Sequence, residues 1–449
     1  MPPHQSSSSS TKSAIKASPF FRPSNTNTCS NQKGGSRYVR TPGGTTRRRR
    51  MRQGEPKEAG AAANSDNDEH KSTVLGCASN LVNAIVGAGI AGLPFALQES
   101  GLVPGIILVL VCALLTEKSL RLLIETAKHA NVPSYETVAE AAYGSLGFWF
   151  VASNMFIMSY GGMLSYLMIV KDTFSSILGI DDVARKRAVL VIISFLIILP
   201  LSCQRDMADL AKTSTLNVCF DLLMVLLVAY LAFHHSDYDE NFFINNEIDI
   251  DSYANTDPYD IWSIRWNTIF VGLGVLSFAF VCQHSSFIIA GSLDRPTKER
   301  WSTVTKLGLG LAACLALVMG ISGYLGFGGA YGAVKGNILN NLPENSGFAQ
   351  LARGLLGITM LFVYPMESFV ARHACVVLLF EGRRAHEGDD ASVLNRRDRR
   401  ITLTVALYFS ALIPAAYFDQ LGDVLAITGA IGGSCLSYIG KKGMNFVYH

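Results

Sequence analysis

One apolar stretch in the first quarter of the chain carries two asparagines, three glycines and a proline. It runs Asn80-Leu-Val-Asn83-Ala-Ile-Val-Gly87-Ala-Gly89-Ile-Ala-Gly92-Leu-Pro94-Phe. Glycine and proline both disfavour a continuous helix, and unpaired backbone groups persist at membrane depth only where they line a cavity or meet a ligand. We therefore expect a functional helix break in this stretch. The alternative is that the glycines serve only as small contacts in helix packing.

A second apolar stretch is interrupted in a similar way. It runs Gly272-Leu-Gly274-Val-Leu-Ser277-Phe-Ala-Phe-Val-Cys-Gln283-His284-Ser285-Ser286. Glycines here give way to a polar cluster in the middle of an apolar block. His284 is a candidate for a proton pathway, but a histidine in a helix is also often a packed, hydrogen-bonded neighbour. The sequence leaves both roles open.

A broken helix offers binding groups that an intact helix keeps paired. The N-terminus of a half-helix presents free N–H groups and the positive end of the helix dipole, which suit a carboxylate. The carbonyls freed by the break can coordinate a cation. A zwitterionic amino acid carries both a carboxylate and a cationic ammonium group, so it is the ligand class that this chemistry predicts.

The helices that position these breaks must cross a membrane. Of the 449 residues, 49% are hydrophobic and 16% are charged, and the mean hydropathy is +0.28. The apolar residues form blocks long enough for the roughly 20-residue helix that crosses a bilayer. This excludes a soluble multidomain protein and a single-pass anchor. We expect about ten transmembrane helices, over residues 74–97, 101–120, 146–170, 187–204, 212–233, 267–290, 304–328, 351–379, 401–418 and 422–440.

Charge placement predicts how these spans are oriented. Residues 1–72 are basic, with a four-arginine run at Arg47–Arg50, and we expect them to form a disordered tail. Lys and Arg gather in the even-numbered loops, which the positive-inside rule assigns to the same, cytoplasmic side as the tail. We expect anionic lipid to attract the tail. The alternative is that residues 1–54 are an organellar transit peptide.

The two interrupted stretches are spans one and six of the ten, at corresponding positions of two five-span halves. Paired interruptions of this kind indicate a secondary transporter built from an inverted repeat, with its substrate near the bilayer midplane. The sequence contains no GxxxxGK[ST], GxSxG or HExxH motif, so we expect neither an enzyme nor an ATP-driven pump. Its nine cysteines form no CxxC pair, which disfavours a zinc site and a disulfide framework.

Three segments carry a family resemblance: NLVNAIVGAGIAGLPFALQESG in the first span, SFAFVCQHSSFIIAGSL in the sixth and YPMESFVARH (Tyr364–His373) in the eighth. Together they resemble the amino acid/auxin permease family, which includes sodium-coupled neutral amino acid transporters and vacuolar amino acid transporters. The resemblance covers residues 72 to about 440. It implies an all-α integral membrane fold of the LeuT type, a five-plus-five inverted repeat, over a transmembrane domain at 73–440. It also implies transport of neutral L-amino acids driven by a Na⁺ or H⁺ gradient.

The resemblance further implies which residues bind. It places substrate contacts along two half-helices, at Val86, Gly87, Ala88, Gly89, Ile90, Gly92, Ser277, Phe278, Ala279 and Phe280. It associates Asn83 and Thr359 with the coupling cation, and their oxygens are the kind of ligand that a hard cation prefers. Apart from Na⁺ as a coupling ion, no cofactor is expected. Family members usually have an eleventh span, which we expect to be missing because only the short tail 441–449 follows the tenth.

Other polar residues within the spans are candidates for the transport pathway. Glu367 lies inside the eighth span, and intramembrane charges are functional candidates by default. Asp221 in the fifth span is similar, with no partner identifiable from sequence. Tyr160 and Tyr166 of the third span are candidates to cover the substrate, although tyrosines more often anchor helices at the membrane interface.

Two functions from different classes are compatible with the sequence. The first is an amino acid transporter in the plasma membrane or a vacuolar or lysosomal membrane, with a cytoplasmic N-terminus. The second is an amino acid sensor or receptor that signals through the N-terminal tail. Both imply an amino acid ligand and a lipid bilayer, and neither implies nucleic acid.

Overall fold

The structure, a computed structural model, describes residues 72–87, 89–203, 211–234, 261–329, 333–343, 346–379, 397–433 and 435–436. These residues are almost entirely helical, and their one β-bridge, between Ser72 and Leu293, is isolated. The predictions of a disordered tail, a transit peptide and lipid attraction concern residues 1–72, of which only Ser72 is described. The tail 441–449 also lies outside the described residues.

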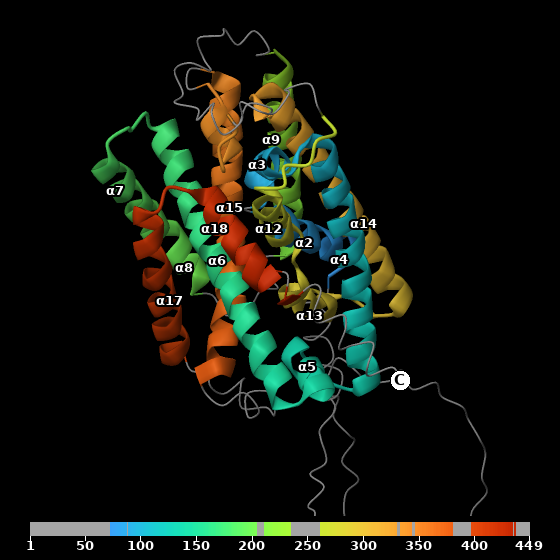
Figure 1. Cartoon of the computed structure of the whole chain (residues 1–449). Helices are drawn as coiled ribbons and strands as arrows, with labels where there is room; N and C mark the ends of the chain where they lie inside the picture. Colours follow the sequence, from blue (N-terminus) through green and yellow to red (C-terminus); the bar gives the residue numbers. More distant parts are fainter. Residues whose placement is uncertain are drawn as a thin grey trace, which may run out of the picture. The chain divides into compact units, whose positions relative to one another are not determined.

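Figure 1 shows a bundle of long helices that run side by side. The N-terminal half consists of α2 (Val74–Val86), α3 (Gly89–Ser100), α4 (Leu102–Ala130), the short α5 (Tyr135–Tyr143), α6 (Ser145–Ile177), α7 (Val183–Ile193), the π-helical turn η2 (Ser194–Ile198), α8 (Leu199–Ser202) and α9 (Ala211–His234). The C-terminal half consists of α12 (Ile269–Phe280), α13 (Gln283–Ser292), α14 (Lys298–Gly326), the 3₁₀ turn η5 (Ile338–Asn341), α15 (Gly347–Leu379), α17 (Arg397–Tyr417), α18 (Leu421–Thr428) and the π-helical turn η7 (Gly429–Gly433).

Each of the ten predicted spans falls on a helix or on consecutive helices. Six described helical segments are long and apolar enough to cross a membrane by length and composition, and the bent pair α2–α3 makes a seventh. The other three predicted spans lie on α4, on α7–η2–α8 and on α18–η7. The second half of α4 is rich in charged residues, α7 begins with the basic run Arg185–Arg187, and α18–η7 is short.

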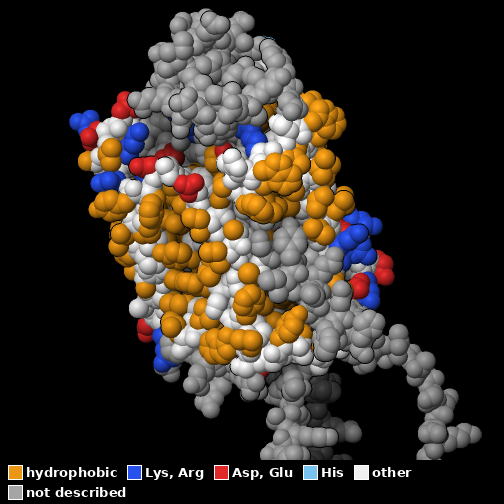
Figure 2. All heavy atoms as spheres, viewed as in Figure 1, with side chains coloured by type: hydrophobic (Ala, Val, Ile, Leu, Met, Phe, Trp, Pro, Cys, Tyr) orange, Lys and Arg blue, Asp and Glu red, His pale blue; other side chains and the backbone are white. Residues whose placement is uncertain are grey.

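Side chains on the outside of the bundle are sorted by type along its length. Figure 2 shows hydrophobic side chains over much of the visible flank, whereas charged side chains gather mostly toward the ends. Large apolar residues such as Leu146, Phe233 and Phe270 are exposed. Exposed apolar surface of this kind marks a protein or membrane contact, and the seven helical segments long and apolar enough to cross a bilayer make the contact a membrane. The chain is therefore a multi-pass membrane protein.

The two halves of the bundle pack with matching partners. α3 packs on α12, α4 on α14 and α6 on α15, so that the first three spans of one half contact their counterparts in the other. Within the halves, α2 packs on α9 as α12 packs on α18, which repeats the contact between first and fifth span. This pattern confirms the predicted all-helical, five-plus-five organisation.

Polar contacts tie the ends of the first broken helix to distant segments. Before α2, the Ser72 N–H donates to the Ser292 carbonyl (2.6 Å), and the Asp294 N–H donates to the Ser72 carbonyl (3.0 Å). Near the end of α3, the Val334 N–H donates to the Gln98 side-chain oxygen at 2.8 Å. The start of α2 is thus linked to the end of α13, and the end of α3 to the segment before η5.

Candidate functional site

Both predicted helix breaks are present. α2 ends at Val86, and Gly87 adopts φ −8° and ψ −133° before α3 begins at Gly89. The helix pair is bent by 50° at this point. α12 ends at Phe280, Val281 is extended with φ −81° and ψ 113°, and the next helix, α13, follows.

Close packing explains why the first break consists of glycines. A Cβ on Gly87 would lie 2.5 Å from the hydroxyl oxygen of Tyr166, and a Cβ on Gly89 would lie 2.6 Å from the Cα of Ala279. Neither position has room for a side chain. The glycines therefore bring α3 against α12 and let Tyr166 reach into the break, so they serve the packing of the site as well as its backbone geometry.

The two breaks differ in how their backbone groups are paired. The ends of a helix leave N–H and C=O groups without intrahelical partners. At the second break, the Cys282 N–H donates to the Gln283 side-chain oxygen at 3.1 Å, and the Ser285 hydroxyl donates to the Cys282 carbonyl at 3.1 Å. The first break, at residues 87–89, has the sequence Gly-Ala-Gly and offers no polar side chain of its own. The Gly87 N–H donates to the Asn83 carbonyl of its own helix at 3.2 Å.

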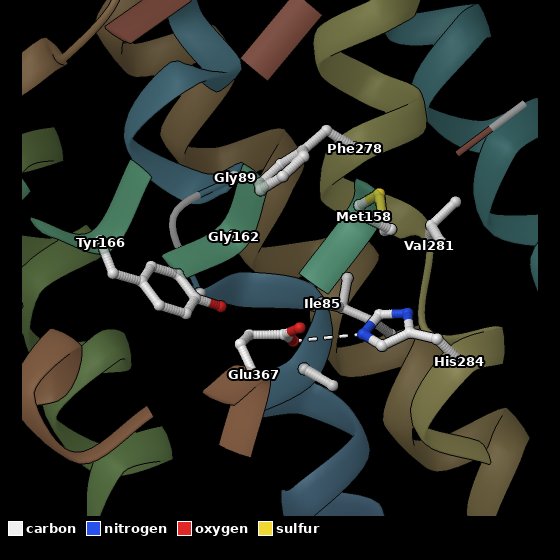
Figure 3. A pocket seen from close by; sticks show the side chains of 11 residues that line it. Ile85, Gly89, Met158, Gly162, Tyr166, Phe278, Val281, His284 and Glu367 are labelled. Atoms are coloured by element: carbon white, nitrogen blue, oxygen red, sulfur yellow. Dashed lines mark hydrogen bonds and ion pairs between the residues drawn. The ribbon is translucent and has the colours of Figure 1, made fainter. Parts of the chain in front are cut away.

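A small cavity lies beside the two breaks (Figure 3). Residues of α2, α3, α6, α12, α13 and α15 and of the two breaks line it, namely Ala84, Ile85, Gly87, Gly89, Met158, Gly162, Tyr166, Phe278, Val281, His284 and Glu367. Its free volume is about 10 Å³, which is room for about one water molecule. The walls of the cavity are therefore close together in this conformation.

One ionisable pair faces the cavity. The His284 Nε2 atom of α13 lies 3.2 Å from the Glu367 Oε1 atom of α15, as Figure 3 shows. The two residues are only 3% and 6% exposed. Each keeps one buried polar atom, His284 Nδ1 and Glu367 Oε2, without a hydrogen-bond partner among the described residues. The pair thus retains one nitrogen and one oxygen with which to bind a ligand.

Six of the candidate residues from the sequence line the cavity: Gly87, Gly89, Tyr166, Phe278, His284 and Glu367. The other described residues of the two predicted half-helix segments are buried without lining it, namely Val86, Ile90, Gly92, Ser277, Ala279 and Phe280. Ala88 lies outside the described residues. The structure therefore brings together one side of each predicted segment at the cavity.

The two tyrosines of the third span face different surroundings. The Tyr160 hydroxyl donates to the Ser410 carbonyl of α17 at 2.7 Å, and Tyr160 does not line the cavity. Tyr166 lines the cavity, with its hydroxyl beside Gly87. The two tyrosines are six residues apart, and over this distance an α-helix rotates by about 240° more than one full turn. Their side chains therefore leave α6 in different directions. The geometry favours Tyr166 over Tyr160 as the tyrosine that meets a ligand.

Sequence reasoning missed the apolar part of the lining. Ala84, Ile85, Met158, Gly162 and Val281 all contribute to it. Their types are common throughout the spans, so nothing in the sequence singles them out, except that Gly162 belongs to a glycine pair. A Cβ on that glycine would lie 3.2 Å from Cγ of Glu367, so the glycine allows the carboxylate of α15 to approach α6.

The two residues expected at a cation are buried but have different partners. The Asn83 amide nitrogen donates to the Ser214 carbonyl of α9 at 3.1 Å, whereas the Thr359 hydroxyl lies beside the Asp221 carboxylate of α9. Asn83 Oδ1 and Thr359 Oγ1 have no hydrogen-bond partner among the described residues. Amide and hydroxyl oxygens are among the ligands that hard cations take. No group of three or more His, Cys, Asp or Glu within the described ranges could hold a metal ion.

The chain matches a known protein family. The model of the family described as "Transmembrane amino acid transporter protein" matches residues 70–440. A putative sodium-coupled neutral amino acid transporter 11 of Danio rerio is 28% identical over 378 residues, which cover 82% of this chain and 77% of the relative. The vacuolar amino acid transporter 2 of Saccharomyces cerevisiae is 26% identical over 390 residues, which cover 83% of this chain and 76% of the relative.

Solved structures also align with the chain, two transporters among them. A manganese transporter of Eremococcus coleocola, in complex with an aromatic bis-isothiourea substituted compound, has a TM-score of 0.46 and 13% identity and covers 83% of this chain and 76% of its own. A Na⁺-coupled sialic acid symporter in a substrate-bound outward-open state has a TM-score of 0.46 and 12% identity, over 83% of this chain and 77% of its own.

Proposed function

The chain belongs to the family of transmembrane amino acid transporter proteins, whose model matches residues 70–440, and on this premise we propose that it moves neutral L-amino acids across a membrane as a secondary active transporter. It works by alternating access and is coupled to a Na⁺ or H⁺ gradient. As a member of this family it is a transporter and not an enzyme. One observation carries the proposed site: two helices from different halves of the chain break beside the same cavity.

The amino acid binds between the two breaks. Its carboxylate accepts hydrogen bonds from the free N–H groups at the start of α3, where the helix dipole is positive. The first break supports this role because its residues, Gly-Ala-Gly, have no polar side chain with which to satisfy those groups. The ammonium group binds carbonyl oxygens freed by the breaks and the unpaired Glu367 Oε2.

The lining supports a neutral side chain on the substrate. Most of the remaining lining residues are small or apolar, including Ala84, Ile85 and Met158. No Lys or Arg is among them, so an acidic side chain would meet no positive partner except a protonated His284. A cationic side chain would share the single carboxylate of Glu367 with the ammonium group of the substrate. A small or apolar side chain avoids both costs.

Alternating access requires a state in which the site is closed, and the contacts at the two ends of α2–α3 support such a state. The strand-like contact of Ser72 with Ser292 and Asp294 joins α2 to the end of α13. The contacts of Gln98 with Val334 join α3 to the segment before η5. With a free volume of about 10 Å³, an amino acid enters only after one of these two sets of contacts opens.

Counterflow exchange in proteoliposomes tests the proposal. The full chain is reconstituted, loaded with one unlabelled amino acid at a time, and exposed to traces of labelled amino acid. We expect exchange for one group of neutral L-amino acids and none for acidic or basic ones. Wild-type protein that exchanges none of the twenty amino acids would contradict the proposal.

The same vesicles test coupling and orientation. Uptake driven by a Na⁺ gradient supports the Asn83–Thr359 region as a sodium site, and uptake driven only by a pH gradient supports a proton. Labelling of the N-terminus in intact cells tests the proposed cytoplasmic tail, which the basic loops support. Lipid binding by residues 1–72 is tested with vesicles with and without anionic lipid. Imaging of the tagged full chain distinguishes a plasma membrane from a vacuolar or lysosomal one.

A further inference from the structure

A carboxylate that the amino acid cavity does not use is buried in the middle of α9. Asp221 is 1% exposed, and the residues that follow it, Leu-Leu-Met-Val-Leu-Leu-Val, are apolar. Neither of its two oxygens has a hydrogen-bond partner among the described residues. An isolated carboxylate charge is very costly to bury, and intramembrane ionisable residues are functional candidates by default. Some positive charge must neutralise Asp221 for this packing to be stable.

Among the described helices, α2, α14 and α15 make the main contacts with α9. α2 contains no Lys, Arg, His, Asp or Glu. The charged residues of α14 are confined to its first nine positions, Lys298–Lys306, and its tyrosine, Tyr324, lies near the other end. These two helices bring no identified counter-charge to the middle of α9.

The charged residues of α15 have partners of their own. Arg353 donates to the carbonyls of Leu339 and Leu342. Arg372 donates to the Thr404 hydroxyl, Glu367 contacts His284, and His373 contacts Glu136 of α5. The polar side chain of α15 that lies next to Asp221 is the fully buried Thr359 hydroxyl. A hydroxyl donor at this position lowers the cost of the buried charge but does not neutralise it, and neither side chain has another partner among the described residues.

Asp221 is also the last residue of a buried polar row on α9. Ser214, Asn217 and Asp221 are separated by three and four residues, so they share one face of the helix. Each is at most 2% exposed. Asn83 of α2 donates to the Ser214 carbonyl at the start of this row. The row therefore leads from the neighbourhood of Asn83 toward the neighbourhood of Thr359.

The atoms left unpaired along this row have one property in common. They are all oxygens: Asn83 Oδ1, Asn217 Oδ1, Asp221 Oδ1, Asp221 Oδ2 and Thr359 Oγ1. Carboxylate, amide and hydroxyl oxygens are the ligands that hard cations take. The Thr359 hydroxyl is the one donor among these five atoms, so it cannot satisfy the other four, whereas a purely structural polar cluster would contain enough donors to match its acceptors.

We propose that Asp221, together with the Thr359 hydroxyl, binds the monovalent cation whose gradient drives transport, and that the Ser214–Asn217 face of α9 leads to this site. The inference rests on the proposed transport function and deepens it by adding a charged ligand to the coupling site. Na⁺ and H⁺ would both act by bringing one positive charge to the Asp221 carboxylate. Na⁺ satisfies it through the surrounding oxygens, and H⁺ satisfies it by converting the group to a neutral acid that donates to a neighbouring oxygen.

The test compares the thermal stability of the purified full chain with that of Asp221→Asn, which keeps the shape and removes the charge. The melting temperature is measured without amino acid, in choline chloride and in NaCl, at several pH values. In choline at alkaline pH we expect the variant to be more stable than the wild type, because the wild type then holds an unpaired buried charge. Adding Na⁺, or lowering the pH, should raise the melting temperature of the wild type toward that of the variant. The cation that has this effect, Na⁺ or H⁺, is the one that neutralises Asp221.

The decisive quantity is the difference in melting temperature between the wild type and Asp221→Asn. A difference that changes with Na⁺ or with pH supports the proposal, and one that is the same under all conditions overturns it. Glu136→Gln is the matched control, since Glu136 is an equally buried acid that pairs with His373 of α15, away from this row. The melting temperature of Glu136→Gln should change with Na⁺ by the same amount as that of the wild type.

Two further measurements keep the test decisive. If Asp221→Asn does not fold, Thr359→Val removes one ligand and should raise the cation concentration for half-maximal stabilisation about tenfold, as expected for a lost hydrogen-bonding partner of a charged group; an unchanged concentration overturns the proposal. In proteoliposomes, gradient-driven accumulation by Asp221→Asn should fall at least about tenfold. Accumulation equal to that of the wild type overturns the inference but leaves the transport function standing, whereas a wild type without exchange refutes the function itself.

Discussion

The hydroxyl of Tyr166 occupies the space in which a side chain on Gly87 would lie, since a Cβ there would come within 2.5 Å of the hydroxyl oxygen. A residue of the third span therefore determines which residue the break of the first span can contain. The two must change together if the site is to keep its shape.

Gly87→Ala should lower amino acid exchange at least about tenfold, because the new methyl group displaces Tyr166 from the cavity wall. Tyr166→Phe in the same chain should restore part of the activity, since it removes the atom that clashes, while ring carbons at 3.2 and 3.3 Å remain. Counterflow rates of the single and double variants measure this. Gly310→Ala is the control, because a Cβ added there would have no atom within 4 Å. Equal rates in the single and double variants would show that the hydroxyl is not the obstacle.

Gly89→Ala should be harmful in a way that a second substitution does not repair. Its Cβ would meet both Cα and Cβ of Ala279 at 2.6 Å. Ala279→Gly removes only the second of these atoms, so α3 and α12 must still move apart. We expect a loss of about 1–3 kcal/mol in the free energy of unfolding, seen as a lower melting temperature of both the single and the double variant. Gly354→Ala, which has open space at its Cβ position, should leave the melting temperature nearly unchanged; full rescue by Ala279→Gly would contradict the backbone clash.

His284 and Glu367 should behave as one unit. Removing either partner of a buried pair leaves the other unsatisfied, at about 1–3 kcal/mol for a hydrogen-bonded polar group. His284→Gln and Glu367→Gln should each lower the free energy of unfolding, and the double variant should lose less than the sum of the two. Unfolding of the purified chain in a double-mutant cycle measures the coupling. Strictly additive losses would show that the 3.2 Å contact contributes nothing.

Lys171 and Asp419 form an ion pair at 2.7 Å in which the two partners are unequal. The lysine side chain is 3% exposed and the aspartate 81%. The ammonium group also donates to the carbonyls of Ala415 and Phe418 at the end of α17. Lys171→Met should therefore cost about 1–3 kcal/mol by leaving these carbonyls unpaired, whereas Asp419→Asn should cost less than about 1 kcal/mol, as surface charges do. Similar losses in the melting temperature of both variants would contradict this ranking.

The sequence predicted the helices better than the cavity. Long apolar blocks and clusters of Gly, Pro and Asn have few explanations in a membrane protein, so the positions of the spans and of both breaks follow from local composition. Tyr166 and Met158 line the cavity because α6 packs on α15. That contact depends on the three-dimensional arrangement of the halves, which no local pattern encodes.

The sequence also could not show which neighbour the side chain of a given helical residue faces. Tyr160 and Tyr166 look alike in sequence, and only the rotation of α6 places one against Ser410 and the other beside Gly87. Asn83 and Thr359 similarly proved to have different partners on α9. The sequence identified Asp221 as a charge inside a span and gave no partner for it, and its neighbours became visible only when α9 was placed against α15.

The link between Ser72 and the end of α13 has a consequence for the biogenesis of the protein. Close to it, the Cys77 thiol donates to the Ile289 carbonyl, 212 residues further along the chain. Ribosomes add about 5 to 20 residues per second, so α2 is synthesised about 10 to 40 s before this partner exists. During that interval the first break has its glycines but none of its contacts with the second half. The first break therefore acquires its packing partners in α12 and α13 only after the whole N-terminal half has been synthesised.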